Sequence, residues 1–148
     1  MTKSHPFTPA LRAWVDVSTQ RSMRGWSHYA RATGLSMPQF SILMQLYYRG
    51  ACGLSEISER FEITNAAASQ HVENLVQAGL IERTEDPHDR RAKHIQLSAK
   101  GKSLIENGIS ERYRWVDQLA QNLSEKERAR TAQALSLLTE AARKLDHT

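Results

Sequence analysis

Apolar residues recur every three or four positions over most of this chain, the spacing that places them on one face of an α-helix. The first such stretch runs from residue 8 or 9 to about residue 32, and Gly34 follows it as a helix-ending residue. One face of this predicted helix carries Leu11, Val15, Ser18, Ser22, Trp26 and Tyr29. The chain is therefore expected to begin with a long amphipathic helix.

Two capping boxes predict where later helices begin. Ser36 and Gln39 have the spacing in which each side chain bonds to the backbone N–H of the other, and Pro38 is tolerated within a first helical turn. Ser124 and Glu127 repeat this spacing. The first box predicts a helix that ends near residues 49–50 and packs through Phe40, Leu43, Leu46 and Tyr47. The second predicts a last helix whose apolar face is formed by Ala132, Leu135, Leu138, Ala142 and Leu145.

Two short helices are expected in the middle of the chain. Residues 51–52 are predicted to be extended, and residues 54–61 to form the first short helix. The second covers residues 65–78, with Thr64 as its N-cap and Gly79 as its C-terminal stop. The side chains expected on its buried face are Ala67, His71 or Val72, Leu75 and Val76.

A charged hairpin follows the second short helix. Its strands are predicted over residues 80–83 and 93–97, and residues 86–91 (Asp-Pro-His-Asp-Arg-Arg) lie at its tip. Ser98 then caps a long helix whose apolar positions are Leu104, Ile105, Ile109, Tyr113, Val116 and Leu119. The predicted fold class is mainly α with a small β-hairpin.

Composition adds only a few constraints. The chain has 148 residues, 40% of them apolar and 24% charged, with a net charge of +4 that is compatible with a nucleic-acid partner. It contains no apolar run long enough to cross a bilayer and begins without a signal-peptide core, so we expect a cytoplasmic protein without a membrane partner. The single cysteine rules out an intrachain disulfide.

Two short helices followed by a charged hairpin are the parts of a winged helix–turn–helix, in which the second helix enters the major groove of DNA. Gln70 has the amide geometry for a bidentate contact to adenine, and small side chains at Ala66 and Ala68 are expected to let the backbone approach the bases. The candidate base-contacting residues are Asn65, Ala66, Ser69, Gln70 and Asn74. The alternative is that they form the solvated face of an alanine-rich helix.

Four segments between about residues 35 and 101 resemble the MarR (multiple antibiotic resistance regulator) family of bacterial transcription factors. They are residues 54–57 (Leu-Ser-Glu-Ile), residues 69–81, residues 86–91 and residues 97–101 (Leu-Ser-Ala-Lys-Gly). Residues 89–95 resemble the SlyA-like branch. With the flanking helices, which agree with the family in number and order, the resemblance covers nearly the whole chain.

The resemblance implies roles for particular residues. Arg91 would enter the minor groove, Asp89 would hold the wing tip in shape, and Arg90 is a second candidate for the groove or a phosphate. Ser69 and Gln70 occupy positions that face the major groove, although many family members carry a basic residue in place of Gln70. This difference leaves the operator sequence open.

Several basic residues are candidates for phosphate contacts, which position a protein on DNA without reading its sequence. They are Arg83, Lys93, Lys100 and Lys102. For each of them the alternative is an ordinary solvated surface charge.

The terminal helices carry more apolar residues than one winged domain needs to cover. We therefore expect residues 1–34 and 99–148 to form a helical dimerisation region, and residues 35–98 to form the DNA-binding domain. In the resembling family these helices intertwine with a symmetry mate, so the expected assembly is a homodimer on a palindromic operator. The alternative is a monomer in which the helices cap one winged domain.

A small aromatic or anionic molecule is a candidate effector, because the resembling family binds such ligands where the dimerisation helices meet the DNA-binding lobe. The candidate ligand-binding residues are Trp26, Tyr29, Tyr47, Tyr48, Tyr113 and, as anion partners, Arg49 or His28. The alternative is that these aromatic residues belong to the core.

Other kinds of site receive little support. Cys52 is expected to be a packed thiol, with a redox sensor as the alternative. No two histidines have an i, i+4 spacing, so no metal site is predicted, and no cofactor is implied. Neither a glycine-rich phosphate loop nor a Gly-x-Ser-x-Gly elbow is present, and an enzyme is therefore not expected.

The sequence thus predicts a DNA-binding transcriptional regulator, with a repressor favoured. One alternative is an activating or architectural regulator that displaces other chromosomal proteins. The other is a winged-helix module whose basic wing binds an acidic protein.

Overall fold

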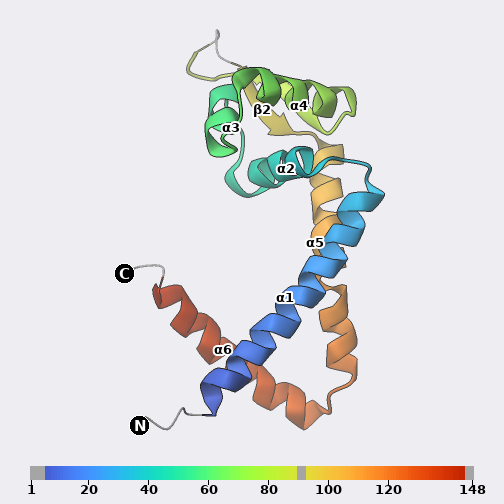
Figure 1. Ribbon diagram of the computed structural model, residues 1–148, viewed down its shortest axis with the longest axis vertical. Coiled ribbons are helices and arrows are strands. Elements are labelled where there is room, and N and C mark those ends of the chain that lie inside the picture. Colours follow the sequence, from blue (N-terminus) through green and yellow to red (C-terminus); the bar gives the residue numbers. More distant parts are fainter. Residues whose placement is uncertain (1–5, 90–92, 146–148) are drawn as a thin grey trace. The chain divides into compact units, whose positions relative to one another are not determined.

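The computed structural model of the chain describes residues 6–89 and 93–145, which contain six helices and one two-stranded antiparallel sheet (Figure 1). The elements are α1 (Phe7–Ala32), α2 (Met37–Arg49), α3 (Leu54–Arg60), α4 (Asn65–Gln77), β1 (Ile81–Glu85), β2 (Lys93–Leu97), α5 (Ala99–Gln121) and α6 (Glu125–Leu145). The chain divides into two units, residues 1–112 and 113–148. The predicted class, mainly α with a β-hairpin, is confirmed.

Both predicted capping boxes are present. Ser36 Oγ accepts from the Gln39 backbone N–H at 3.4 Å, and Gln39 Oε1 accepts from the Ser36 N–H at 3.0 Å. At the start of α6, Ser124 Oγ accepts from the Glu127 N–H at 3.3 Å and Glu127 Oε2 accepts from the Ser124 N–H at 2.8 Å. This backbone bond lowers the pKa of the Glu127 carboxyl. Because each box satisfies otherwise unpaired first-turn amides, both helices begin where the sequence predicts.

The wing is a short hairpin extended on one side by a single bridge. β1 pairs with β2 in a register that matches Ile81 with Leu97 and Glu85 with Lys93. The first strand lies slightly later than predicted, because Leu80 precedes it and pairing continues to Glu85. On β2, Ile95 exchanges two backbone hydrogen bonds with Cys52, of 3.1 and 2.8 Å, so the predicted extended piece at residues 51–52 adds to the sheet.

The hydrophobic core lies where α2, α3, α4 and the start of α5 meet the hairpin. Its fully buried large side chains are Phe40, Ile42, Leu43, Ile57, Val72, Leu75, Ile81 and Ile105. Ala68 belongs to this core and is 0% exposed, so the prediction that its small side chain lets the backbone approach the bases is wrong. Val72 and Leu75 set the buried face of α4, and Ala68 falls on it four residues before Val72. Ala67, which was predicted to be buried, is half-buried at the edge of this face.

Polar contacts join the end of α4 to the start of α5. Ser98 Oγ donates to the Gly79 carbonyl at 2.6 Å and accepts from the Gly101 N–H at 3.0 Å, which confirms Ser98 as the cap of α5. Lys100 Nζ donates to the Ala78 carbonyl at 2.8 Å, at the negative end of the α4 dipole. These contacts fix the second helix of the motif against the helix that follows the wing.

α1 packs against the first half of α5. At Gly25 the two backbones come so close that a Cβ would lie 2.7 Å from the Glu111 carbonyl oxygen. The Tyr29 hydroxyl donates to the Leu104 carbonyl at 2.8 Å, and a Cβ on Gly108 would meet the Tyr29 ring at 2.9 Å. Glycine at these two positions therefore allows α1 and α5 to pack closely against each other.

Several apolar side chains of α1 and α6, the first and last helices, are exposed. In α6 the structure shows no buried residue, and Leu137 and Leu145 are 70% and 76% exposed. In the first half of α1, Phe7, Val15 and Val17 are each 50% exposed. Within the ranges described, no helix is both long enough and apolar enough to cross a membrane.

Candidate nucleic-acid interface

The first turns of α4 present the polar side chains that the sequence predicts for base contacts. Thr64 caps the helix by accepting from the Ala67 N–H at 3.1 Å. Asn65, Ala66, Gln70 and Asn74 are exposed along it, and Ser69 is half-buried. All five predicted positions therefore lie on one short helix whose polar side is open to a partner.

Asn65 also has a structural contact. The Ser58 Oγ of α3 lies 2.6 Å from Asn65 Oδ1 and 2.9 Å from the Ser55 carbonyl oxygen, so its single hydroxyl hydrogen is shared between these two acceptors. The contact with Asn65 links the two helices of the motif and orients the Asn65 amide. Asn65 therefore helps to hold the helix–turn–helix geometry.

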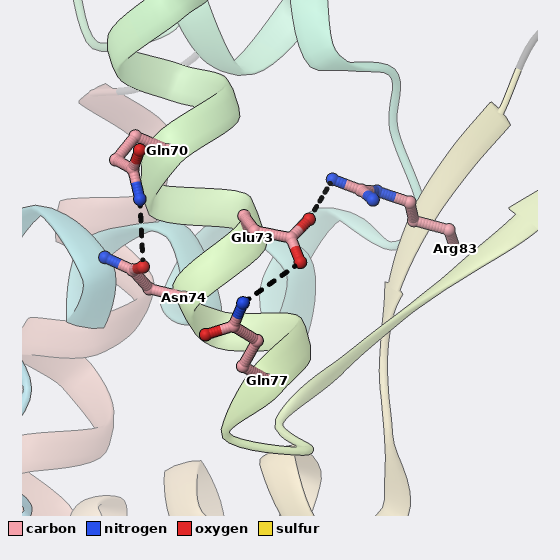
Figure 2. A network of polar contacts seen from close by, with 5 residues as sticks. All are labelled: Gln70, Glu73, Asn74, Gln77 and Arg83. Atoms are coloured by element: carbon pink, nitrogen blue, oxygen red, sulfur yellow. Dashed lines mark hydrogen bonds and ion pairs between the residues drawn. The ribbon is translucent and has the colours of Figure 1, made fainter.

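Exposed side chains on α4 pair with one another along the helix (Figure 2). Gln70 Nε2 donates to Asn74 Oδ1 at 3.1 Å, and Gln77 Nε2 donates to Glu73 Oε1 at 3.4 Å. In the first pair, Gln70 retains its carbonyl oxygen and a second amide hydrogen, the two groups that a bidentate adenine contact requires. The bond to Asn74 is therefore compatible with the predicted contact of Gln70 to adenine.

Arg83 reaches from β1 back to α4. Its Nη2 lies 3.0 Å from Glu73 Oε2, which makes an ion pair between the wing and the second helix of the motif (Figure 2). Sequence analysis named Arg83 as a candidate phosphate contact and did not identify Glu73. The two residues are ten positions apart and lie on different elements, so no helical or strand spacing in the sequence indicates that they pair.

The three candidate lysines lie in different surroundings. Lys93 is exposed at the start of β2. Lys100 is hydrogen-bonded to the Ala78 carbonyl, as described above. Lys102 is 3.9 Å from Glu106 Oε1 on the next turn, a loose pair on a well-exposed surface.

Asp86 organises the base of the wing tip. Its Oδ1 accepts from the His88 N–H at 2.7 Å, and its Oδ2 lies 2.9 Å from His94 Nε2 on β2. The His88 backbone bond is the main cause that lowers the pKa of the Asp86 carboxyl, and the charge of His94 also contributes. Sequence analysis did not identify this role, although an Asp that accepts from the N–H two residues later is a known turn signal.

Asp89 is exposed at the wing tip, at the end of the first described range. Arg90 and Arg91, the predicted groove-binding arginines, lie outside the described residues. The structure thus defines the base of the wing tip through Asp86 and His94. The roles predicted for Asp89 and the two arginines stay predictions.

The predicted ligand-binding residues are distributed over several sites. Trp26 packs edge-on against Phe40 with ring centroids 4.8 Å apart, and Tyr47 and Tyr48 form their own edge-on pair at 5.2 Å. Tyr48 and Arg49 are exposed at the end of α2. Tyr113 belongs to the second unit of the chain.

A hollow of about 350 Å³ between α1 and α5 includes two of the predicted residues. It is lined by His28, Tyr29, Ala32, Asn107, Ser110 and Glu111. Burial and, to a smaller extent, the charge of Glu111 raise the pKa of the Tyr29 hydroxyl. The same carboxylate would oppose an anionic ligand in this hollow.

Cys52 is a core residue. It is 4% exposed, and Gln45 Nε2 lies 3.8 Å from its sulfur. Burial, aided by the charge of Glu56, raises the pKa of the thiol and so disfavours the reactive thiolate. The packed thiol is the form that the structure supports. Among the described residues, no three His, Cys, Asp or Glu side chains gather as metal ligands.

We expect Cys52 to react slowly with a thiol-reactive disulfide reagent at neutral pH. Reaction requires local opening of the core, so the folded protein should react at least roughly tenfold more slowly than the chain in urea. The release of the coloured leaving group measures both rates. Equal rates would show that the thiol is accessible and would reopen the redox alternative.

A helix–turn–helix followed by a β-hairpin wing defines the class of winged helix–turn–helix proteins. Residues 35–93 match the model of the MarR family. The Bacillus subtilis HTH-type transcriptional regulator YdgJ is 27% identical over 100 residues, 68% of this chain and 61% of YdgJ. Two other Bacillus subtilis relatives carry the name HTH-type transcriptional repressor.

Solved structures show the same fold. The transcriptional regulator Tm0710 from Thermotoga maritima matches with a TM-score of 0.83 at 23% identity, over 95% of this chain and 99% of that one. A mutant of MepR from S. aureus, bound to an oligodeoxyribonucleotide, matches with a TM-score of 0.61 at 20% identity, over 94% and 99% of the two chains.

The part of the chain that contains the helix–turn–helix and the first wing strand is thus similar to the MarR family, and the curated relatives that match are named as HTH-type transcriptional regulators. The matches do not assign it to the SlyA-like branch in particular. The chain spans less than two thirds of the length of the first two curated relatives that it matches, 61% of one and 63% of the other.

Proposed function

We propose that this chain is a DNA-binding transcriptional repressor that acts as a homodimer on a palindromic operator. The observation that carries the proposal is the exposed polar surface of α4, which lies beside a wing whose tip is held at its base by the Asp86–His94 pair. A helix of this size fits the major groove, and a wing at its side can follow the backbone into the next minor groove. Because DNA is its proposed partner, we place the protein in the cytoplasm.

Related proteins support this proposal. Two curated relatives are named as repressors, and the S. aureus MepR mutant of the same fold was solved bound to an oligodeoxyribonucleotide. By analogy, α4 would be the recognition helix of this chain, with Gln70 and Asn74 toward the bases and Arg91 in the minor groove.

The exposed apolar side chains of α1 and α6 support a dimer. Leu135, Leu137 and Leu145 of α6 and Val15 and Val17 of α1 would be covered by a second copy. We therefore keep residues 1–34 and 99–148 as the proposed dimerisation region. A two-fold axis would place the two recognition helices about 34 Å apart, one turn of DNA.

The hollow beside Tyr29 is the site that we propose for a small aromatic effector. Because Glu111 lines it, a neutral or cationic aromatic molecule suits it better than the anion suggested by the sequence. The protein would have one conformation that binds DNA and one that does not. Such a ligand would release DNA only if its affinity for the second conformation were higher than its affinity for the first.

Selection of bound duplexes from a random pool tests the proposal. We expect enrichment of an imperfect palindrome with half-site centres one helical turn apart. A pool that shows no enrichment, together with specific capture of an acidic protein, would favour the protein-interaction alternative instead.

Replacing Gln70 with alanine is expected to relax the preference for one base pair in each half-site. Loss of a bidentate amide contact costs about 1–3 kcal/mol of discrimination. Competition binding with duplexes that carry each of the four base pairs at that position measures the effect. Gln121→Ala on α5 is the control, and an unchanged preference in Gln70→Ala would remove Gln70 from the set of base-contacting residues.

A further inference from the structure

Helix α4 contains no lysine or arginine, and its one formally charged residue at neutral pH is Glu73. Most proteins that bind DNA draw affinity from cations that displace the counterions of the phosphates. In this chain the central helix of the proposed interface therefore carries a net negative charge. The cations have to come from the wing and the helices around it.

The basic side chain of the first wing strand, Arg83, is held by that negative charge. Its guanidinium lies 3.0 Å from Glu73 Oε2, while Gln77 donates to the other carboxylate oxygen at 3.4 Å (Figure 2). Glu73 thus lies between a partner on its own helix and a partner on β1. The ion pair draws the carboxylate toward the side of α4 that faces the wing.

The ion pair stays accessible to solvent. The side chains of Arg83 and Glu73 are 38% and 42% exposed, so a phosphate can approach the guanidinium. To bind Arg83, that phosphate has to replace the Glu73 carboxylate. The displaced carboxylate then lies near the phosphate with its negative charge no longer compensated by Arg83. A phosphate contact made this way gains little, because one ionic contact is lost for each one formed.

We propose that Glu73 is a specificity-determining residue, which withholds the Arg83 cation from sequence-independent binding to phosphates. This inference rests on the proposed DNA-binding function and deepens it. A neutralised pair adds nothing to the binding of random DNA, whereas the base contacts of Gln70 and Asn74 are kept. The ratio of operator binding to non-specific binding is then larger than it would be with an unpaired Arg83.

The salt dependence of DNA binding tests the proposal, since each phosphate contact by a cation changes the slope of log Kobs against log salt by about 0.9. In Glu73→Gln the guanidinium is released, and the slope should steepen by about 0.9. Affinity for random duplex should rise roughly fivefold to tenfold at about 0.1 M salt. Arg83→Gln alone should leave the slope unchanged, and the double variant should return to the wild-type slope.

Two matched controls separate this effect from a general change in charge. Glu82→Gln removes the same charge from the neighbouring, exposed position of β1, and Glu73→Asp keeps the carboxylate. Both should bind random duplex nearly as the wild type does. An equal gain in Glu82→Gln, or a slope that falls by about 0.9 in Arg83→Gln, would overturn the proposal.

The outcome also distinguishes this inference from the function on which it rests. A wild-type protein that binds no duplex would overturn both. Salt-dependent binding by the wild type with an unchanged slope in Glu73→Gln would overturn only the role of Glu73. Because the side chains of this pair are partly exposed, these variants should fold like the wild type, which circular dichroism checks.

Discussion

Replacing Gly101 with alanine is expected to lower the free energy of unfolding by about 3 kcal/mol. A Cβ at this position would overlap the Leu80 carbonyl oxygen and lie 2.9 Å from its carbonyl carbon and 3.2 Å from Leu97 Cδ2. The Leu80 carbonyl cannot move away easily, because it accepts from the Ser98 N–H at 3.1 Å. The clash is therefore with the Leu80 backbone and the Leu97 side chain, and it outweighs the better helix propensity of alanine, about 1 kcal/mol. Urea unfolding followed by circular dichroism measures the loss.

Gly53 provides the matched control. It lies at the start of α3 with φ of −83°, and a Cβ there would have no neighbour within 4 Å. Gly53→Ala should therefore change stability by less than about 1 kcal/mol. Equal unfolding curves for Gly101→Ala and the wild type would show that α5 does not press against the wing as described.

Replacing Arg91 with alanine is expected to weaken binding to every duplex by roughly tenfold to hundredfold. The resemblance of residues 86–91 to the MarR wing implies that this guanidinium would enter the minor groove, where the narrow groove concentrates negative potential. Because the contact is mainly to shape and charge, operator and random DNA should both lose affinity. Fluorescence anisotropy with labelled duplexes measures the change.

Arg143 in the last turn of α6 supplies the control, since its replacement removes the same charge outside residues 35–98. Arg143→Ala should bind operator nearly as tightly as the wild type. A similar loss in both variants would indicate an effect of net charge. No loss in Arg91→Ala would remove the wing arginine from the interface.

Local patterns in the sequence predicted most of the fold. Ser36 with Gln39, Ser124 with Glu127, and Thr64 are all observed as caps, because each bond joins residues three positions apart. The second wing strand and the start of α5 also match, since alternation and Ser98 mark them clearly. Such features depend on neighbouring residues alone.

The orientation of α4 about its axis was predicted less well. Residues 66–68 are all alanine, so the apolar pattern there does not distinguish the buried position from its neighbours. Packing of Val72 and Leu75 decides it and buries Ala68. The polar side formed by Asn65, Gln70 and Asn74 nevertheless matches the predicted surface.

Contacts between distant side chains could not be predicted from the sequence. Lys100 and Arg83 were both expected at phosphates, yet Lys100 bonds to the end of α4 and Arg83 to Glu73. Their partners lie 22 and 10 positions away, where no helical or strand spacing relates them. Only the folded chain shows which cations have a partner within the protein.

The proposed repressor binds one palindromic duplex as two copies of the chain. The most direct test is a titration of the selected operator, at duplex concentrations well above Kd and at two salt concentrations. We predict saturation at two chains per duplex, with an affinity that falls steeply with salt. Saturation at one chain, or no binding to any duplex in dilute buffer, would contradict it.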